Sequence, residues 1–88
     1  MRSKKSKPLT RAERDHLGKV KSLMCSVCDA PGPSEAHHIK QGQHFSCAAL
    51  CVECHRGNQG WHGGKALWRV YKMDELDALA ITIERLIA

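Results

Sequence analysis

Apolar residues follow a helical period at both ends of the chain and form short runs in the middle. Near the C terminus they recur three or four residues apart, at Leu76, Leu79, Ala80, Ile83, Leu86 and Ile87. This spacing predicts a helix capped by Asp74 that supplies most of the apolar surface, as core or as a dimer face. At the other end, Thr10 and Glu13 have the spacing of a capping box, which predicts a helix from Arg11 to Leu23. Its apolar positions are sparse, so we expect it to lie across the surface.

Between these helices the sequence predicts a hairpin followed by short helical segments. The expected order is a strand over 34–39, a turn over 40–43, a returning strand over 44–46, a connection over 48–50 and a helix starting near Cys54 or His55. Four glycines within residues 57–64 interrupt that helix, because each glycine costs about 1 kcal/mol relative to alanine. Residues 65–72 are expected to be helical. We expect Trp61 and Trp68 to be core residues, with base stacking as the alternative.

Four of the five cysteines form two CxxC pairs, Cys25 with Cys28 and Cys51 with Cys54. This spacing is typical of a tetrahedral four-cysteine zinc site. Disulfides are the alternative, but the first residues contain no apolar signal segment, so we expect a cytoplasmic location where paired cysteines more often bind metal. No apolar run is long enough to span a bilayer, and no membrane association is expected. Cys47 is expected to be a small buried residue or a competing zinc ligand.

The 88 residues predict one small α+β domain stabilised by zinc, because a core of this size alone gives only marginal stability. Residues 1–9 are basic and polar and contain a proline, which predicts a disordered arm. The rest, 10–88, is expected to be a single domain. Within it we expect a basic helix over 10–24, a metal core over 25–62 and C-terminal helices over 65–88.

Positive charge is concentrated at the N-terminal end of the chain. Residues 1–24 carry eight of the 14 Lys and Arg residues and only two of the nine acidic ones, and the remainder is slightly negative. A basic segment of this kind is expected to contact phosphates without reading base sequence, and a solubilising tail is the alternative. The candidate nucleic-acid contacts are Arg11, Arg14, Lys19, Lys21, Arg56 and Lys65.

Histidines accompany the cysteine pairs. His37 and His38 lie between the pairs, His55 follows Cys54 directly, and His62 comes seven residues later. A four-cysteine site requires none of them, so they predict a second site; exposed histidines or substitute zinc ligands are the alternatives. On a straight helix His55 and His62 would be about 10 Å apart along the axis, too far to bind one ion. The glycines between them permit a fold-back that could bring them together.

Taken together, these motifs resemble a known family. Cys25-x-x-Cys28, Glu35-Ala-His37-His38-Ile39 and Leu50-Cys51-x-x-Cys54-His55 are similar to the HNH branch of the His-Me finger (ββα-metal) nucleases, closest to small phage and prophage Ref-like recombination-enhancement nucleases. The resemblance covers residues 25–62 and implies a treble-clef, ββα-metal core. It implies a DNA endonuclease of low sequence specificity that leaves 5′-phosphate and 3′-hydroxyl ends. Single-stranded or duplex substrate, a recombinase partner and the oligomeric state are left open.

The resemblance assigns roles position by position. It implies that His38 is the general base, which suits an imidazole titrating near neutral pH. It implies that His37, His55 and His62 hold a catalytic divalent ion, in addition to the structural Zn²⁺ of the cysteines. Three imidazoles favour Zn²⁺, Ni²⁺ or Mn²⁺ by ligand type, whereas many related enzymes are expected to use Mg²⁺.

The chain departs from the family pattern in two respects. The middle asparagine, which helps orient the general base, is missing; a backbone carbonyl or His44 is the candidate substitute. In addition, neighbours on a regular strand point to opposite faces, so His37 and His38 can serve one site only if the strand ends or bulges there. The alternatives in function are a non-catalytic zinc-stabilised nucleic-acid-binding or adaptor module, and a nuclease remnant with a broken metal site.

Overall fold

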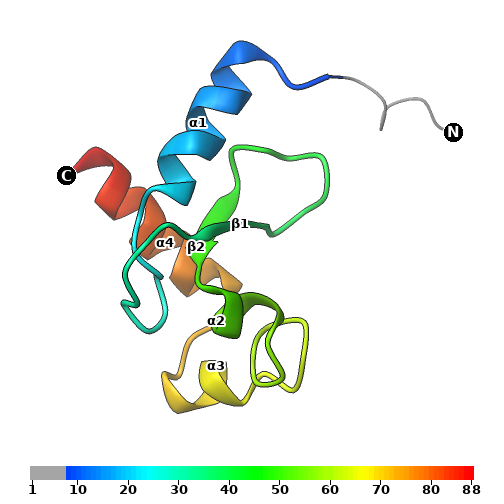
Figure 1. The fold of residues 1–88 in the computed structure, drawn as a ribbon, viewed down its shortest axis with the longest axis vertical. Coiled ribbons are helices and arrows are strands. Elements are labelled where there is room, and N and C mark those ends of the chain that lie inside the picture. The colour runs from blue at the N-terminus through cyan, green and yellow to red at the C-terminus, as the bar shows by residue number, and fades with distance from the viewer. Residues whose placement is uncertain (1–7) are drawn as a thin grey trace, which may run out of the picture.

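The structure, a computed structural model, describes residues 8–88, and the rest of the predicted arm lies outside the described residues. Its elements are α1 (Arg11–Lys21), β1 (Glu35–His38), β2 (Cys47–Leu50), α2 (Val52–Arg56), α3 (Ala66–Val70) and α4 (Glu75–Ile87). The predicted small α+β domain is confirmed: an antiparallel hairpin lies between α1 on one side and α2 and α3 on the other (Figure 1). Within residues 8–88, no helix is long and apolar enough to cross a membrane.

Helix α1 begins with the predicted capping box. The Glu13 amide donates to the Thr10 hydroxyl (3.1 Å), and the Thr10 amide donates to the Glu13 carboxylate (2.8 Å). The helix ends at Lys21, two residues before the expected end. Leu9 falls in the predicted arm, yet it is half-buried against the cluster beneath α1.

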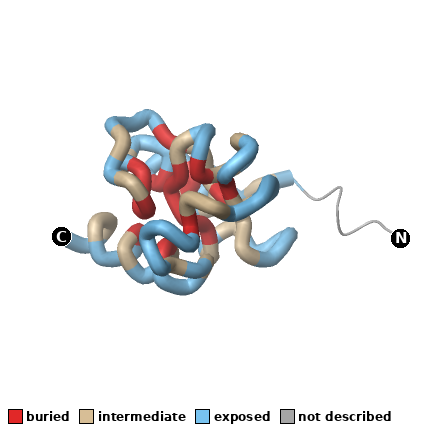
Figure 2. Tube along the Cα trace, turned by 90° about the horizontal axis from the view of Figure 1, so that it is seen from below, coloured by how far each residue is buried: buried red, intermediate tan, exposed pale blue. Residues whose placement is uncertain are grey.

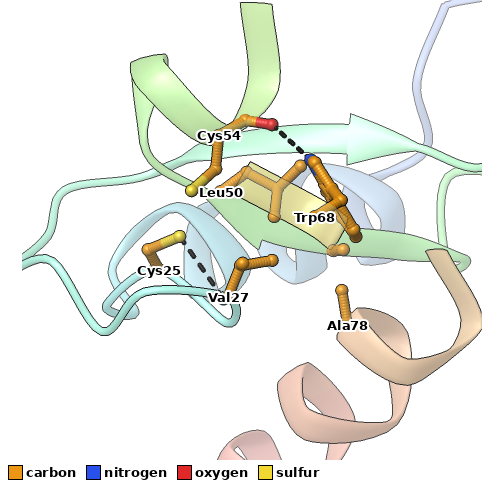
Figure 3. Packing of buried hydrophobic residues seen from close by; sticks show 7 residues of the cluster. Cys25, Val27, Leu50, Cys54, Trp68 and Ala78 are labelled. Atoms are coloured by element: carbon orange, nitrogen blue, oxygen red, sulfur yellow. Dashed lines mark hydrogen bonds between the residues drawn. The ribbon is translucent and has the colours of Figure 1, made fainter. Parts of the chain in front are cut away.

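Strand β2 separates two clusters of buried side chains. The first contains Cys25, Val27, Ala48, Leu50, Cys54, Trp68 and Ala78 (Figure 3). The second contains Leu17, Val20, Cys47 and Ala49. The β2 residues alternate between the clusters because successive side chains of a strand point to opposite faces. Both faces are covered, so all of β2 is buried, and buried chain runs through the middle of the molecule (Figure 2).

The predicted returning strand over 44–46 is wrong, because the strand lies at Cys47–Leu50, where we expected only a connection. Residues 40–46 instead form turns, with amide bonds from Gln43 to the Lys40 carbonyl (3.1 Å) and from Ser46 to the Gln43 carbonyl (3.3 Å). A strand covered on both faces reads as a short continuous apolar run, without the alternation that a half-exposed strand shows. Helix α2 likewise begins earlier than expected, at Val52.

Helix α4 is capped by Asp74 as predicted, but its buried face is not the predicted one. Ala78 and Thr82 are fully buried, whereas Leu76 and Ile87 are 66% and 80% exposed. Thr82 accounts for this orientation: its Oγ1 accepts from the Ala49 amide (3.1 Å) on the edge of β2 and donates to the Ala78 carbonyl (2.9 Å). Small side chains on both elements allow helix and strand to approach closely.

The prediction that the tryptophans are core residues is confirmed for Trp68, which is 2% exposed. Its Nε1–H donates to the Cys54 carbonyl (2.8 Å; Figure 3). Trp61 is half-buried and packs edge-on against Trp68, with ring centroids 4.9 Å apart. The Lys65 ammonium lies 4.4 Å from the Trp61 ring centroid, a cation–π distance.

Candidate metal centres

The four cysteines of the two CxxC pairs converge at one end of the hairpin. Their sulfur atoms all lie within 4.8 Å of one another, an arrangement consistent with a zinc site. Cys28 Sγ and Cys51 Sγ, one from each pair, are 3.7 Å apart, far beyond the ~2.05 Å of a disulfide. All five cysteines are free. The structure therefore favours the predicted metal cluster over the disulfide alternative.

Within each CxxC pair, a backbone amide points at a cysteine sulfur atom. The Val27 amide lies 3.4 Å from Cys25 Sγ, and the Cys54 amide lies 3.4 Å from Cys51 Sγ. Burial opposes ionisation of Cys25, but the amides of Cys28, Cys51 and Val27 outweigh it and lower the Cys25 pKa. Burial raises the pKa of Cys51 to about 11 and raises that of Cys54 as well. Ionisation of Cys51 and Cys54 near neutral pH thus requires a cation nearby.

The second centre is formed by three histidines from three segments, His37 on β1, His55 on α2 and His62 in the loop after α2. One ring nitrogen of each lies within 4.8 Å of the others. The ring centroids are 5.0 to 5.2 Å apart. His37 is buried, His55 is half-buried and His62 is exposed, so the centre opens to solvent on the His62 side.

The predicted glycine fold-back brings His62 beside His55. After α2 the chain reverses, and the amides of Trp61 and His62 donate to the carbonyls of Cys54 (2.8 Å) and His55 (2.9 Å). A side chain at Gly60 would overlap backbone atoms of Glu53 and Cys54, so the close approach requires glycine there. The fold-back therefore depends on backbone packing that only glycine permits.

Two carboxylates hold the outer nitrogens of the centre. Glu35 Oε1 lies 2.8 Å from His55 Nδ1, and Glu75 Oε2 lies 2.6 Å from His37 Nε2. Hydrogen bonds from Arg56 and then from His55 lower the Glu35 pKa to about 2, so this carboxyl is ionised. Burial lowers the His37 pKa, which favours the neutral, ligand-competent ring.

Sequence reasoning did not assign a role to either carboxylate. Glu35 had a local signal, because it lies two residues before His37 and therefore on the same face of β1. Glu75 had none, since it is 38 residues away from His37 and is brought there by the packing of α4.

His38 lies on the other face of the hairpin, and β1 ends there. Its cross-strand partner is Cys47, whereas the partner of His37 is Ala48, so the two neighbouring histidines point to opposite faces as expected for a regular strand. His38 Nε2 lies 3.0 Å from His44 Nδ1. Burial, and then the charge of His44, lowers the His38 pKa.

The predicted nucleic-acid contacts fall into two groups. Those on α1 are exposed: Arg11, Arg14, Lys19 and Lys21. Arg56 instead places its guanidinium on the Glu35 carboxylate (2.8 to 3.0 Å), so much of its hydrogen-bonding capacity is already used. Lys65 is exposed beside Trp61.

The structure thus brings together the predicted cysteine set and the predicted histidine set, and it leaves Cys47 outside both. The Cys47 thiol is buried and donates to the His44 carbonyl (3.2 Å). Both sets have the donor chemistry to bind metal ions such as zinc. No protein-family model, curated protein or solved structure matches the chain.

Proposed function

We propose that this chain is a metal-dependent DNA endonuclease of the HNH type, with a treble-clef, ββα-metal core. The observation that carries the proposal is the convergence of His37, His55 and His62 in one centre. His38 ends β1 on the other face of the hairpin, close enough for the charges of His37 and His55 to act on it. The order of strand, returning strand and helix supports the ββα assignment. The four-cysteine cluster fits a structural Zn²⁺, because four thiolates form a closed tetrahedral site.

The residues around the histidine centre fit a catalytic divalent ion. Imidazole nitrogens suit Zn²⁺, Ni²⁺ and Mn²⁺, and a carboxylate on the outer nitrogen is the usual partner of a metal-binding histidine. An ion held by His37, His55 and His62 would stabilise negative charge on the scissile phosphate and on the leaving 3′ oxygen. The open side at His62 leaves room for a phosphate to approach.

His38 is the proposed general base, and His44 orients it. When His38 Nε2–H donates to His44 Nδ1, the lone pair of His38 Nδ1 stays free to accept a proton. Burial keeps this ring neutral near pH 7 by lowering its pKa. His38 takes a proton from water, the water oxygen attacks phosphorus, the bond to the 3′ oxygen breaks, and that oxygen takes a proton from solvent. His44 thereby fills the place of the missing asparagine.

The exposed basic residues of α1 are the proposed DNA contacts. Helix α1 packs against both strands of the hairpin, and the charge of Lys21 is close enough to act on His38. A phosphate backbone lying along α1 would therefore reach the end of β1. Contacts of this kind hold DNA through its charge and carry no base readout, which agrees with the low sequence specificity proposed.

The test is cleavage of supercoiled and single-stranded DNA with Mg²⁺, Mn²⁺ and Ni²⁺ by the wild type, His38→Ala and His16→Gln at equal zinc content. His16 is on α1 and belongs to neither histidine set, which makes its variant the matched control. We expect His38→Ala to lose about 10²–10⁴-fold in rate while DNA binding is kept, and the control to cleave normally. Wild-type rates in His38→Ala would rule out its role as the base.

Two other outcomes identify the alternatives. Wild-type protein that binds DNA but cleaves neither substrate with any of the three ions is the non-catalytic zinc-stabilised module. Protein that holds one zinc tightly and binds no second ion is the nuclease remnant. Metal content by mass spectrometry or atomic emission, measured on the same samples, separates these two results.

A further inference from the structure

We propose that Glu75, the first residue of α4, is a positioning residue for the histidine centre: it holds His37 so that Nδ1 is the nitrogen offered to the ion. The proposal rests on the metal site of the proposed function but does not require cleavage. Glu75 reaches His37 from the far end of the chain, because α4 packs along β2 on the side of the hairpin that carries His37.

The carboxylate of Glu75 and the Nε2 atom of His37 are too close together to be ligands of the same metal ion. Glu75 Oε2 and His37 Nε2 are 2.6 Å apart, the length of a strong charge-assisted hydrogen bond. Two ligand atoms at about 2.0–2.1 Å from one tetrahedral ion would be about 3.3 Å apart. The His37 Nε2–H therefore donates to the carboxylate. The lone pair on Nδ1 then remains for the ion.

The pair is shielded from water, which strengthens its effect on the ring. The His37 side chain is 3% exposed and the Glu75 side chain is 23% exposed. In such surroundings a carboxylate fixes both the tautomer and the ring orientation of a metal-binding histidine and makes its free nitrogen a better donor to the metal. His55 has the equivalent partner in Glu35. Nδ1 of His37 and Nε2 of His55 have no hydrogen-bond partner among residues 8–88.

Helix α4 is held in place at both ends, and this fixes the position of Glu75. At the N-terminal end, the Asp74 and Asp77 side chains form a reciprocal capping box around Glu75, with bonds of 2.9 and 3.0 Å. At the C-terminal end, Arg85 donates to the Cys25 carbonyl (3.2 Å) of the first CxxC pair and to the carboxylate of Asp29 (2.7 Å), which directly follows that pair. The helix N-terminus also stabilises the negative charge of Glu75.

The experiment titrates Zn²⁺ into protein that already holds one zinc in its cysteine cluster, comparing the wild type with Glu75→Ala, Glu75→Gln and Glu84→Gln. Glu84 is exposed on the same helix and is the matched control. We expect Glu75→Ala to weaken the second zinc by about 10–100-fold. Glu75→Gln should weaken it less, because its amide oxygen still accepts from Nε2–H, and the control should match the wild type.

A nitrogen-15 NMR measurement on the His37 ring of the two-zinc protein gives a readout that a purely structural role would not change. We expect Nδ1 to bear the zinc and Nε2 to remain protonated. Zinc on Nε2, or unchanged zinc affinity in Glu75→Ala, would overturn the proposal. If zinc binding depends on Glu75 but the protein does not cleave DNA, the proposed nuclease function alone is overturned. If the protein cleaves DNA but its zinc affinity is the same without Glu75, this proposal alone is overturned.

Discussion

The His62 amide donates a 2.9 Å hydrogen bond to the His55 carbonyl, and this bond closes the loop that places both imidazoles in one centre. The loop depends on a close backbone approach at Gly60, where a Cβ would lie 2.8 Å from the Cys54 carbonyl carbon and oxygen. The histidine centre is therefore sensitive to a single methyl group that touches none of its three histidines directly.

We expect Gly60→Ala to push the loop away from α2, lowering stability by about 1–3 kcal/mol and weakening the second metal ion by at least tenfold. Gly64→Ala is the matched control, because the nearest atom to its Cβ is 3.5 Å away, at ordinary contact distance. Calorimetric titration of zinc and thermal unfolding of both variants measure the two effects. Equal metal affinity in Gly60→Ala and Gly64→Ala would contradict the tight-loop explanation.

Replacing one ligand of the cysteine cluster should unfold the domain. We expect Cys51→Ser to lose its zinc and its cooperative thermal transition, because structural zinc contributes on the order of 10 kcal/mol to small domains of this kind. Cys47→Ala should keep the zinc content of the wild type, since Cys47 lies outside the cluster. A colorimetric zinc assay and circular dichroism test the pair, and a Cys51→Ser protein with wild-type zinc content and a cooperative thermal transition would refute the four-cysteine assignment.

The buried Cys47 thiol makes stability depend on pH above neutrality. Burial raises its pKa from the ordinary 9.0 to about 11, so the unfolded chain releases this proton first as pH rises. Its contribution is fully present below pH 9 and decreases between pH 9 and 11, by an amount on the order of 2 kcal/mol. The free energies of unfolding of zinc-loaded wild type and Cys47→Ala, measured with denaturant, should therefore change with pH at different slopes over this window. Parallel plots against pH would show that the thiol does not titrate there.

The Ser26, Thr82 and Ala49 contacts should behave as one unit. Thr82 Oγ1 gives its hydrogen to the Ala78 carbonyl, so it accepts from the Ser26 hydroxyl (2.7 Å) and from the Ala49 amide (3.1 Å). We expect Thr82→Val to cost about 1–3 kcal/mol, because it leaves a buried amide unpaired. Ser26→Ala should then cost less in the Thr82→Val background than in the wild type. Additive free energies of unfolding in this double-mutant cycle would contradict the coupling.

The basic face of α1 should appear as a salt dependence of DNA binding. Removing two phosphate contacts with Lys19→Gln and Lys21→Gln should lower the slope of log affinity against log salt by up to ~1.8 for duplex DNA. Lys72→Gln, an equal change in charge after α3 on the opposite side of the hairpin, serves as the comparison (Figure 1). Fluorescence anisotropy from 50 to 200 mM salt measures both, and equal slopes would move the DNA contact away from α1.

Features encoded within a few residues could be predicted from the sequence. The CxxC pairs, the capping box at Thr10 and the cap at Asp74 depend on local spacing, and all of them are present in the structure. The convergence of His55 with His62 was also predictable, because the intervening glycines left a fold-back as the way to bring the two rings together.

Features that depend on packing between distant segments could not be predicted in this way. The buried face of α4 is set by Thr82 and its bond to the edge of β2, which outweighs the larger apolar area of Leu76 and Ile87. The returning strand could not be located because it is buried on both faces, so its residues do not alternate between apolar and polar. Glu75 had no signal near His37 at all, since tertiary packing alone brings the two together.

Cys54 and His55 are consecutive residues of α2, yet the sulfur belongs to the cysteine cluster and the imidazole belongs to the histidine centre. Oxidation of a zinc-binding thiolate by peroxide would release the structural ion and free the turn of helix that carries His55. The histidine centre contains no sulfur, but it would lose its geometry in the same event. Oxidation of the cysteine cluster would thus inactivate the proposed nuclease, and reduction in the presence of zinc would restore the histidine centre.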